Sequence, residues 1–172
     1  MNARIVALMV AFVLLPLMAA ATEHPSAEDI ATKLDGAARS WGSDRGITVT
    51  KAEPDGVAAI DLTINFEFNS AALTSDGEVL VGNLGRALKD PRLAGKRFRI
   101  QGHTDAVGGD VFNQRLSEQR AETVRRQLIT GHTIPASRLD VVGYGESRLL
   151  DPSQPTSGAN RRVRVVNLGD GR

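Results

Sequence analysis

The stretch RFRIQGHTDAVGGDVFNQRLSEQRAETVRRQL, residues 97–128, decides the fold because it joins a strand to a helix through a glycine-rich turn. Phe98 and Ile100 alternate with polar residues, which is the period of a half-buried strand. Gly102 ends this run, and Asp110 is a favourable N-cap for the helix that follows. The spacing therefore predicts a strand, a loop with polar side chains, and then a long amphipathic helix.

The helix expected after Asp110 has an apolar side that contains two polar residues. At about 100° per residue, that side carries Phe112, Leu116, Ala121, Val124 and Leu128. Asn113 and Arg120 interrupt it and are nearly superimposed along the helix. Because an unpaired buried charge is costly, Arg120 must reach water, pair with a structural carboxylate, or form one wall of a site for an anionic ligand. Asp105 is the obvious opposite charge for such a site.

Four motifs follow one another along the chain: GHTDAVG at 102–108, LSEQRAETV at 116–124, VVGYGE at 141–146 and NRRVRV at 160–165. Their order and spacing resemble those of the OmpA-like C-terminal domain, and the resemblance covers about residues 60–168. It implies a non-enzymatic protein that binds peptidoglycan without a covalent bond, and so anchors or links an envelope component to the cell wall.

The resemblance also implies which residues form the ligand pocket. Asp105 in the GHTD motif and Arg120 in the LSxxRA motif would hold the diaminopimelate residue of the cell-wall peptide. Four further residues are expected to line or border the same pocket: Asn113, Arg161, Thr104 and Asn69. For Asn69, ordinary turn chemistry is the alternative role.

The chemistry of diaminopimelate suits these residue types. Its free end carries an ammonium and a carboxylate side by side. A carboxylate accepts hydrogen bonds from the ammonium, and a planar guanidinium can bind the carboxylate through two parallel hydrogen bonds.

One departure from the family pattern concerns residues 156–160, which form a shorter loop that lacks the usual arginine. This departure leaves the path of the loop and the contribution of Arg161 open.

Residues 1–21 have the features of a secretory signal peptide. Arg4 lies near the N-terminus, an almost unbroken apolar run follows at 5–17, and residues 19–21 form an A-x-A site. We expect cleavage after Ala21; an uncleaved anchor is the alternative, although the apolar run is at the short limit for spanning a bilayer. The expected location is the periplasm, in association with the cell wall or the outer membrane.

The composition narrows the class of protein. The 172 residues include no cysteine, which excludes disulfides, thiolate metal sites and N-terminal lipidation. A net charge of +1 and an aromatic content of 4% argue against nucleic acid as a partner, because nucleic acid requires a basic face with stacking rings. The sequence therefore predicts no nucleic-acid partner, no lipid anchor and no cofactor.

The remaining elements belong to a domain over residues 57–172 and to an N-terminal extension at 22–56. In the domain we expect a strand at 60–68, a helix with a capping box at Ser75, and strands at 139–142 and 162–168. The order β-α-β-α-β-β predicts an α/β (α+β) two-layer sandwich with a mixed sheet and helices on one face. In the extension, Ser26 and Asp29 predict a capping box and a short helix, and a strand is possible after Ile47.

Two other classes of function stay open on the sequence. An envelope protein-interaction module would have the same fold without a peptidoglycan ligand, and its expected contact with a partner is the extension at 22–56. A cell-wall hydrolase would need an activated nucleophile, or two carboxylates facing across a sugar, and Asp105 is the one well-placed carboxylate. His103 and Asp105 form an H-x-D pair, but His24 and His132 lie elsewhere, so we expect no metal site.

Overall fold

The computed structural model describes residues 24–36, 47–48 and 57–170. The expected signal peptide and residues 37–46 and 49–56 of the extension lie outside the described residues. The elements, in chain order, are α1 (Ala27–Leu34), β1 (Ile47–Thr48), β2 (Ala59–Leu62), α2 (Ser75–Ala87), β3 (Lys96–Gly102), α3 (Asp110–His132), β4 (Leu139–Gly143) and β5 (Val163–Asp170). None of the helices in this part of the chain is long and apolar enough to cross a membrane.

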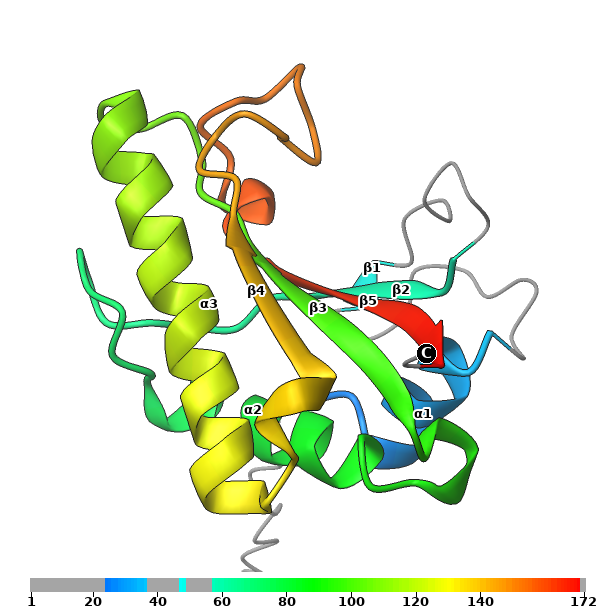
Figure 1. The fold of residues 1–172 in the computed structure, drawn as a ribbon. Helices are drawn as coiled ribbons and strands as arrows, with labels where there is room; N and C mark the ends of the chain where they lie inside the picture. Colours follow the sequence, from blue (N-terminus) through cyan, green and yellow to red (C-terminus); the bar gives the residue numbers. More distant parts are fainter. Residues whose placement is uncertain (1–23, 37–46, 49–56, 171–172) are drawn as a thin grey trace, which may run out of the picture.

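The strands form one mixed sheet in the order β1-β2-β5-β3-β4 (Figure 1). β3 and β4 are parallel, as expected for two strands joined by a helix, and β5 runs antiparallel between β2 and β3. The last strand of the chain therefore completes the middle of the sheet. The predicted mixed sheet with a single helical layer is confirmed.

A single apolar core fills the space between the sheet and the helices. Alternate residues of the strands face it, among them Ile60, Leu62, Phe98, Ile100, Val163 and Val165. The helices contribute the apolar residues that their spacing places on one side, among them Leu80, Leu84, Val124 and Leu128. Ile30 and Leu34 of α1 are also fully buried in this core, and Ser26 closes the expected capping box of that helix. The first helix of the extension is therefore an integral part of the folded unit.

The strand expected at 60–68 is wrong beyond Leu62. Leu62 pairs with Val163, the first residue of β5, so the residues that follow Leu62 have no neighbouring strand to extend the ladder. They form a loop instead, closed by a bridge between Phe66 and Leu73, and Phe68 at its tip is 98% exposed. The loop leads into α2, whose N-cap is Thr74 and not the expected capping box at Ser75.

The buried side of α3 differs in part from the expected one. Phe112 is 48% exposed, whereas Asn113 and Ser117 are buried with the apolar residues. This side of the helix faces the ends of β3 and β4 at close range. A Cβ atom on Gly102 of β3 would lie 2.1 Å from the carbonyl oxygen of Ser117, and one on Gly143 of β4 would lie 2.5 Å from the hydroxyl of Ser117. α3 also begins at Asp110, with Gly109 as its N-cap, so the charge of Asp110 lies in the first turn.

Candidate functional site

All six residues expected to contact a ligand line one open cleft of about 730 Å³. The cleft lies between the loop after β3, the first half of α3, the loop after β2 and the residues that lead into β5. The six residues are Asn69, Thr104, Asp105, Asn113, Arg120 and Arg161. Most of the remaining wall is apolar and includes Phe66, Phe68, Val107, Phe112 and Leu116. The cleft therefore combines a few charged groups with an apolar rim, as ligand sites commonly do.

Asp105 is fixed in the cleft by its own loop and by one cation. Its carboxylate accepts a hydrogen bond from the backbone N–H of Val107 (3.2 Å) and an ion-pair hydrogen bond from Arg161 Nη1 (2.6 Å). The side chain of Asp105 is 10% exposed, whereas that of Arg161 is 55% exposed. The carboxylate is therefore held rigidly, while its present partner extends into solvent.

Arg120 forms a separate wall and has no carboxylate partner among the described residues. Its Nε donates to the carbonyl oxygen of Ser70 (3.0 Å), and its guanidinium lies over the Phe66 ring, 4.9 Å from the ring centroid. Burial and the nearby charge of Arg161 lower the pKa of Arg120, an effect that Asp105 opposes. The guanidinium is thus oriented by one hydrogen bond and an aromatic face, with donors left for an anion.

Asn113, Thr104 and Asn69 shape the cleft. Asn113 is buried, and its Nδ2 donates to the carbonyl oxygens of Asp105 (3.3 Å) and Val107 (3.1 Å) and contacts the carboxylate of Glu146. Thr104 is buried too, and its Oγ1 has no hydrogen-bond partner within the described ranges. Asn69 is exposed at a turn with φ of 51°, which an asparagine tolerates, so turn chemistry accounts for this residue whether or not it binds a ligand.

Asn160, which opens the NRR motif, was not expected to shape the site. Its fully buried side chain donates to the carbonyl oxygens of Gln154 (2.8 Å) and Pro155 (3.2 Å) and accepts from the backbone N–H of Asp151 (2.9 Å). Pro155 in turn accepts from the N–H of Ala106, beside Asp105. The shortened loop is therefore ordered by Asn160, and it still brings the next residue, Arg161, to Asp105.

His103 lies next to the cleft in a buried position beside Tyr144. Its ring is 2% exposed and stacks on Tyr144, with 5.4 Å between the ring centroids. Burial and the positive charges of Arg162 and Arg164 lower the pKa of His103 to about 3, so the ring is neutral. Among the described residues, no three histidine, aspartate or glutamate side chains converge on a point.

Arg162 and Arg164 are held on the sheet by Asp61. The two carboxylate oxygens of Asp61 accept from Arg162 Nε and Arg164 Nη1, each at 2.8 Å, and all three side chains are buried. The NRRVRV motif therefore supplies one arginine to the cleft, Arg161, and two to a buried ion-pair cluster.

Proteins of the bacterial envelope share this sequence pattern. Outer membrane porin F of Pseudomonas aeruginosa is 34% identical over 111 residues, which are 63% of this chain and 31% of that protein. The probable lipoprotein YiaD of Escherichia coli is 31% identical over 124 residues, 70% of this chain and 55% of that protein. The chain thus spans between about a third and a little over half of the length of these relatives.

Solved structures share the fold. The cell wall anchor of the T6SS from Pseudomonas aeruginosa superposes with a TM-score of 0.59 at 19% identity, over 86% of this chain and all of that one. The peptidoglycan-associated lipoprotein from Burkholderia pseudomallei superposes with a TM-score of 0.51 at 26% identity, over 60% of this chain and 87% of that one. The model of the OmpA family matches residues 65–163, which are more than half of the chain and include every residue that lines the cleft. On this evidence the chain belongs to the OmpA family.

Proposed function

We propose that this protein binds peptidoglycan non-covalently through the diaminopimelate residue of the stem peptide, and so links an envelope component to the cell wall. The observation that carries the proposal is the separation of charge in the cleft. Asp105 already has a cation, Arg161, while Arg120 faces the same cleft with no carboxylate partner among the described residues. A ligand that brings both an ammonium and a carboxylate satisfies both walls.

In the proposed complex, the ammonium of diaminopimelate donates to the carboxylate of Asp105, and the adjacent carboxylate accepts from the guanidinium of Arg120. Asp105 can accept further hydrogen bonds, because a carboxylate has about four lone-pair sites and two are occupied. Arg161 can stay at Asp105 or swing aside, since more than half of its side chain is in solvent. Asn113 acts through the loop that it orders and is not required to touch the ligand.

The cleft is open to solvent, so the charge pairs formed in it are partly screened. We therefore expect modest affinity that weakens as the salt concentration rises. A periplasmic location follows from the signal-peptide features of residues 1–21, and it agrees with the envelope proteins to which the chain is similar.

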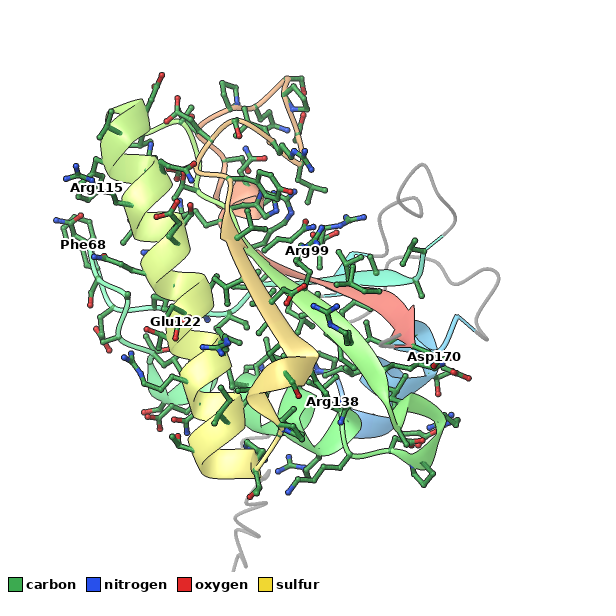
Figure 2. All side chains as sticks on the ribbon, viewed as in Figure 1. Phe68, Arg99, Arg115, Glu122, Arg138 and Asp170 are labelled. Carbon is green, nitrogen blue, oxygen red and sulfur yellow. The ribbon has the colours of Figure 1, made fainter. Side chains whose placement is uncertain are left out.

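The proposal is tested by sedimentation with purified sacculi that contain diaminopimelate. The variants are Asp105→Asn and Arg120→Gln, each with a control that removes the same charge elsewhere. Arg115→Gln acts on an exposed residue of α3, and Asp170→Asn acts on the exposed end of β5 (Figure 2). We expect the wild type and both controls to sediment with the sacculi, and the two cleft variants to stay in solution although their circular dichroism is native. Failure of the wild type to sediment would reject the proposal and favour the interaction module.

The same sacculi test the hydrolase alternative. Incubation with the wild-type protein is expected to release no soluble sugar or peptide fragments, because Asp105 is bound by Arg161 and by the backbone N–H of Val107, and Glu67, a further carboxylate on the cleft wall, is exposed to solvent. Release of fragments that is abolished by Asp105→Asn would overturn the non-enzymatic assignment.

A further inference from the structure

A second cavity, of about 380 Å³, adjoins the cleft and shares Phe66, Arg120 and Arg161 with it. It opens where the β2–β5 ladder ends. Beyond the pair Leu62–Val163, residues 63–66 and residues 158–162 separate and leave room between them. The cavity is thus a direct consequence of the early end of β2.

The lining of the second cavity is strongly cationic. Arg120, Arg161 and Arg162 all contribute to its wall. The carboxylate of Asp76 lies on the same wall, but it is 57% exposed and 3.8 Å from the imidazole of His24, so solvent screens much of its charge. Asp105 pairs with Arg161, and Asp61 shares its single charge between Arg162 and Arg164, whereas Arg120 has no carboxylate partner among the described residues. An anion in this cavity would therefore still face more positive than negative charge.

His103 supplies an independent sign of a ligand. Its side chain lines the cavity and is 2% exposed. The backbone of Arg148 lies close enough to oppose the lowering of the His103 pKa, but no group among the described residues meets either ring nitrogen with the geometry of a hydrogen bond. A buried polar group without a partner is destabilising, and such groups are rare in folded proteins. A neutral imidazole carries one N–H, which can donate to an acceptor that enters the cavity.

The cleft itself has balanced charges. Arg120 and Arg161 bring two positive charges to it, and Asp105 and the exposed Glu67 bring two negative charges. The free end of diaminopimelate is a zwitterion and adds no net charge. The attraction for a further carboxylate therefore lies in the second cavity, whose wall carries Arg120, Arg161 and Arg162.

We propose that the second cavity binds another carboxylate of the same stem peptide, which accepts from His103 and from the arginine wall. This inference rests on the proposed function and extends it. Two groups of the peptide have the required chemistry: the free α-carboxylate of its γ-linked D-glutamate, and its C-terminal carboxylate. The cavity would thus distinguish a stem peptide with free carboxylates from one in which they are amidated.

The test uses isothermal titration calorimetry with the mature protein and four ligands. These are free meso-diaminopimelate, the peptide L-Ala-γ-D-Glu-meso-diaminopimelate-D-Ala, and the same peptide amidated either at glutamate or at the C-terminus. We expect one of the amidated peptides to bind about tenfold more weakly than the parent peptide, as for the loss of one charge-assisted hydrogen bond. In His103→Phe the ratio of the affinity for the parent peptide to the affinity for that amidated peptide should fall towards one. The control His132→Phe should leave this ratio unchanged.

The outcomes separate the two proposals. If free diaminopimelate and all three peptides fail to bind, the proposed function is wrong. If diaminopimelate binds and the three peptides have equal affinities, the proposed function stands and the second carboxylate site is rejected. A discrimination that persists unchanged in His103→Phe would also reject it, because the carboxylate would then be recognised outside this cavity. Each comparison is a ratio within one protein, so a general loss of folded material cancels.

Discussion

Acid should destabilise this fold through His103, because its buried ring is neutral. Burial and the charges of Arg162 and Arg164 lower the pKa of His103 from 6.5 to about 3 in the folded protein. Below pH 6.5 the unfolded chain takes up a proton that the folded protein takes up only near pH 3. The stability contributed by the neutral ring is therefore complete above pH 6.5 and is lost as the pH falls towards 3.

The size of the effect follows from these two pKa values. Within this window, one proton changes the free energy of unfolding by about 1.4 kcal/mol per pH unit. Between pH 8 and pH 5 the loss is thus about 2 kcal/mol from this group alone. Urea unfolding at both pH values measures the total change, to which other groups also contribute.

The variant His103→Phe isolates the contribution of the histidine. Phenylalanine fills a similar volume, can keep the stacking on Tyr144 and does not titrate. Between pH 8 and pH 5, the free energy of unfolding of His103→Phe should fall by about 2 kcal/mol less than that of the wild type. Parallel pH dependences in the two proteins would refute the reasoning, because they would mean that the folded protein protonates His103 as readily as the unfolded chain. An imidazole NMR resonance of His103 that titrates near pH 6.5 in the folded protein would refute it too.

Three further substitutions, two of them with a matched control substitution, test the packing of the fold and the rim of the cleft. Asp61→Asn removes the carboxylate that Arg162 and Arg164 share, and should lower the free energy of unfolding in urea by about 3 kcal/mol or more; Asp140→Asn, at the half-exposed pair with Arg97, should cost less than about 1 kcal/mol. Gly102→Ala places a Cβ atom 2.1 Å from the carbonyl oxygen of Ser117 and should cost about 3 kcal/mol in the same assay; Gly109→Ala, whose Cβ meets nothing within 4 Å, should cost less than about 1 kcal/mol. Phe68→Ser should change stability by less than about 0.5 kcal/mol because the ring is 98% exposed, yet weaken sedimentation with sacculi because that ring lines the cleft (Figure 2). Equal stability losses within either matched pair, or unaltered sedimentation of Phe68→Ser, would contradict these expectations.

The local sequence could indicate a site residue where the polarity of that residue does not fit the pattern of its neighbours. Arg120 conflicted with an apolar helix side, and the structure places it on a cleft wall without a carboxylate partner in the described residues. Phe112 and Phe68 followed the apolar periodicity of their elements but are exposed. Their exposure depends on distant residues: the glycine contact of Gly102 sets the rotation of α3, and the start of β5 at Val163 ends β2. Periodicity along one segment contains no information about either partner.

The partner of Asp105 could not be predicted for the same reason, and it determines how the cleft works. The path of the shortened loop selects Arg161, because Asn160 orders the turn that precedes it. Asp105 thus has a cation partner within the protein itself, and its charge is not left buried and unpaired. Arg120 lies on another wall, where it contacts Phe66 and the Ser70 carbonyl, so the two charges that we propose bind the ligand do not neutralise each other. Opposite charges that are fixed apart before a ligand arrives are the preorganisation that recognition of a zwitterion requires.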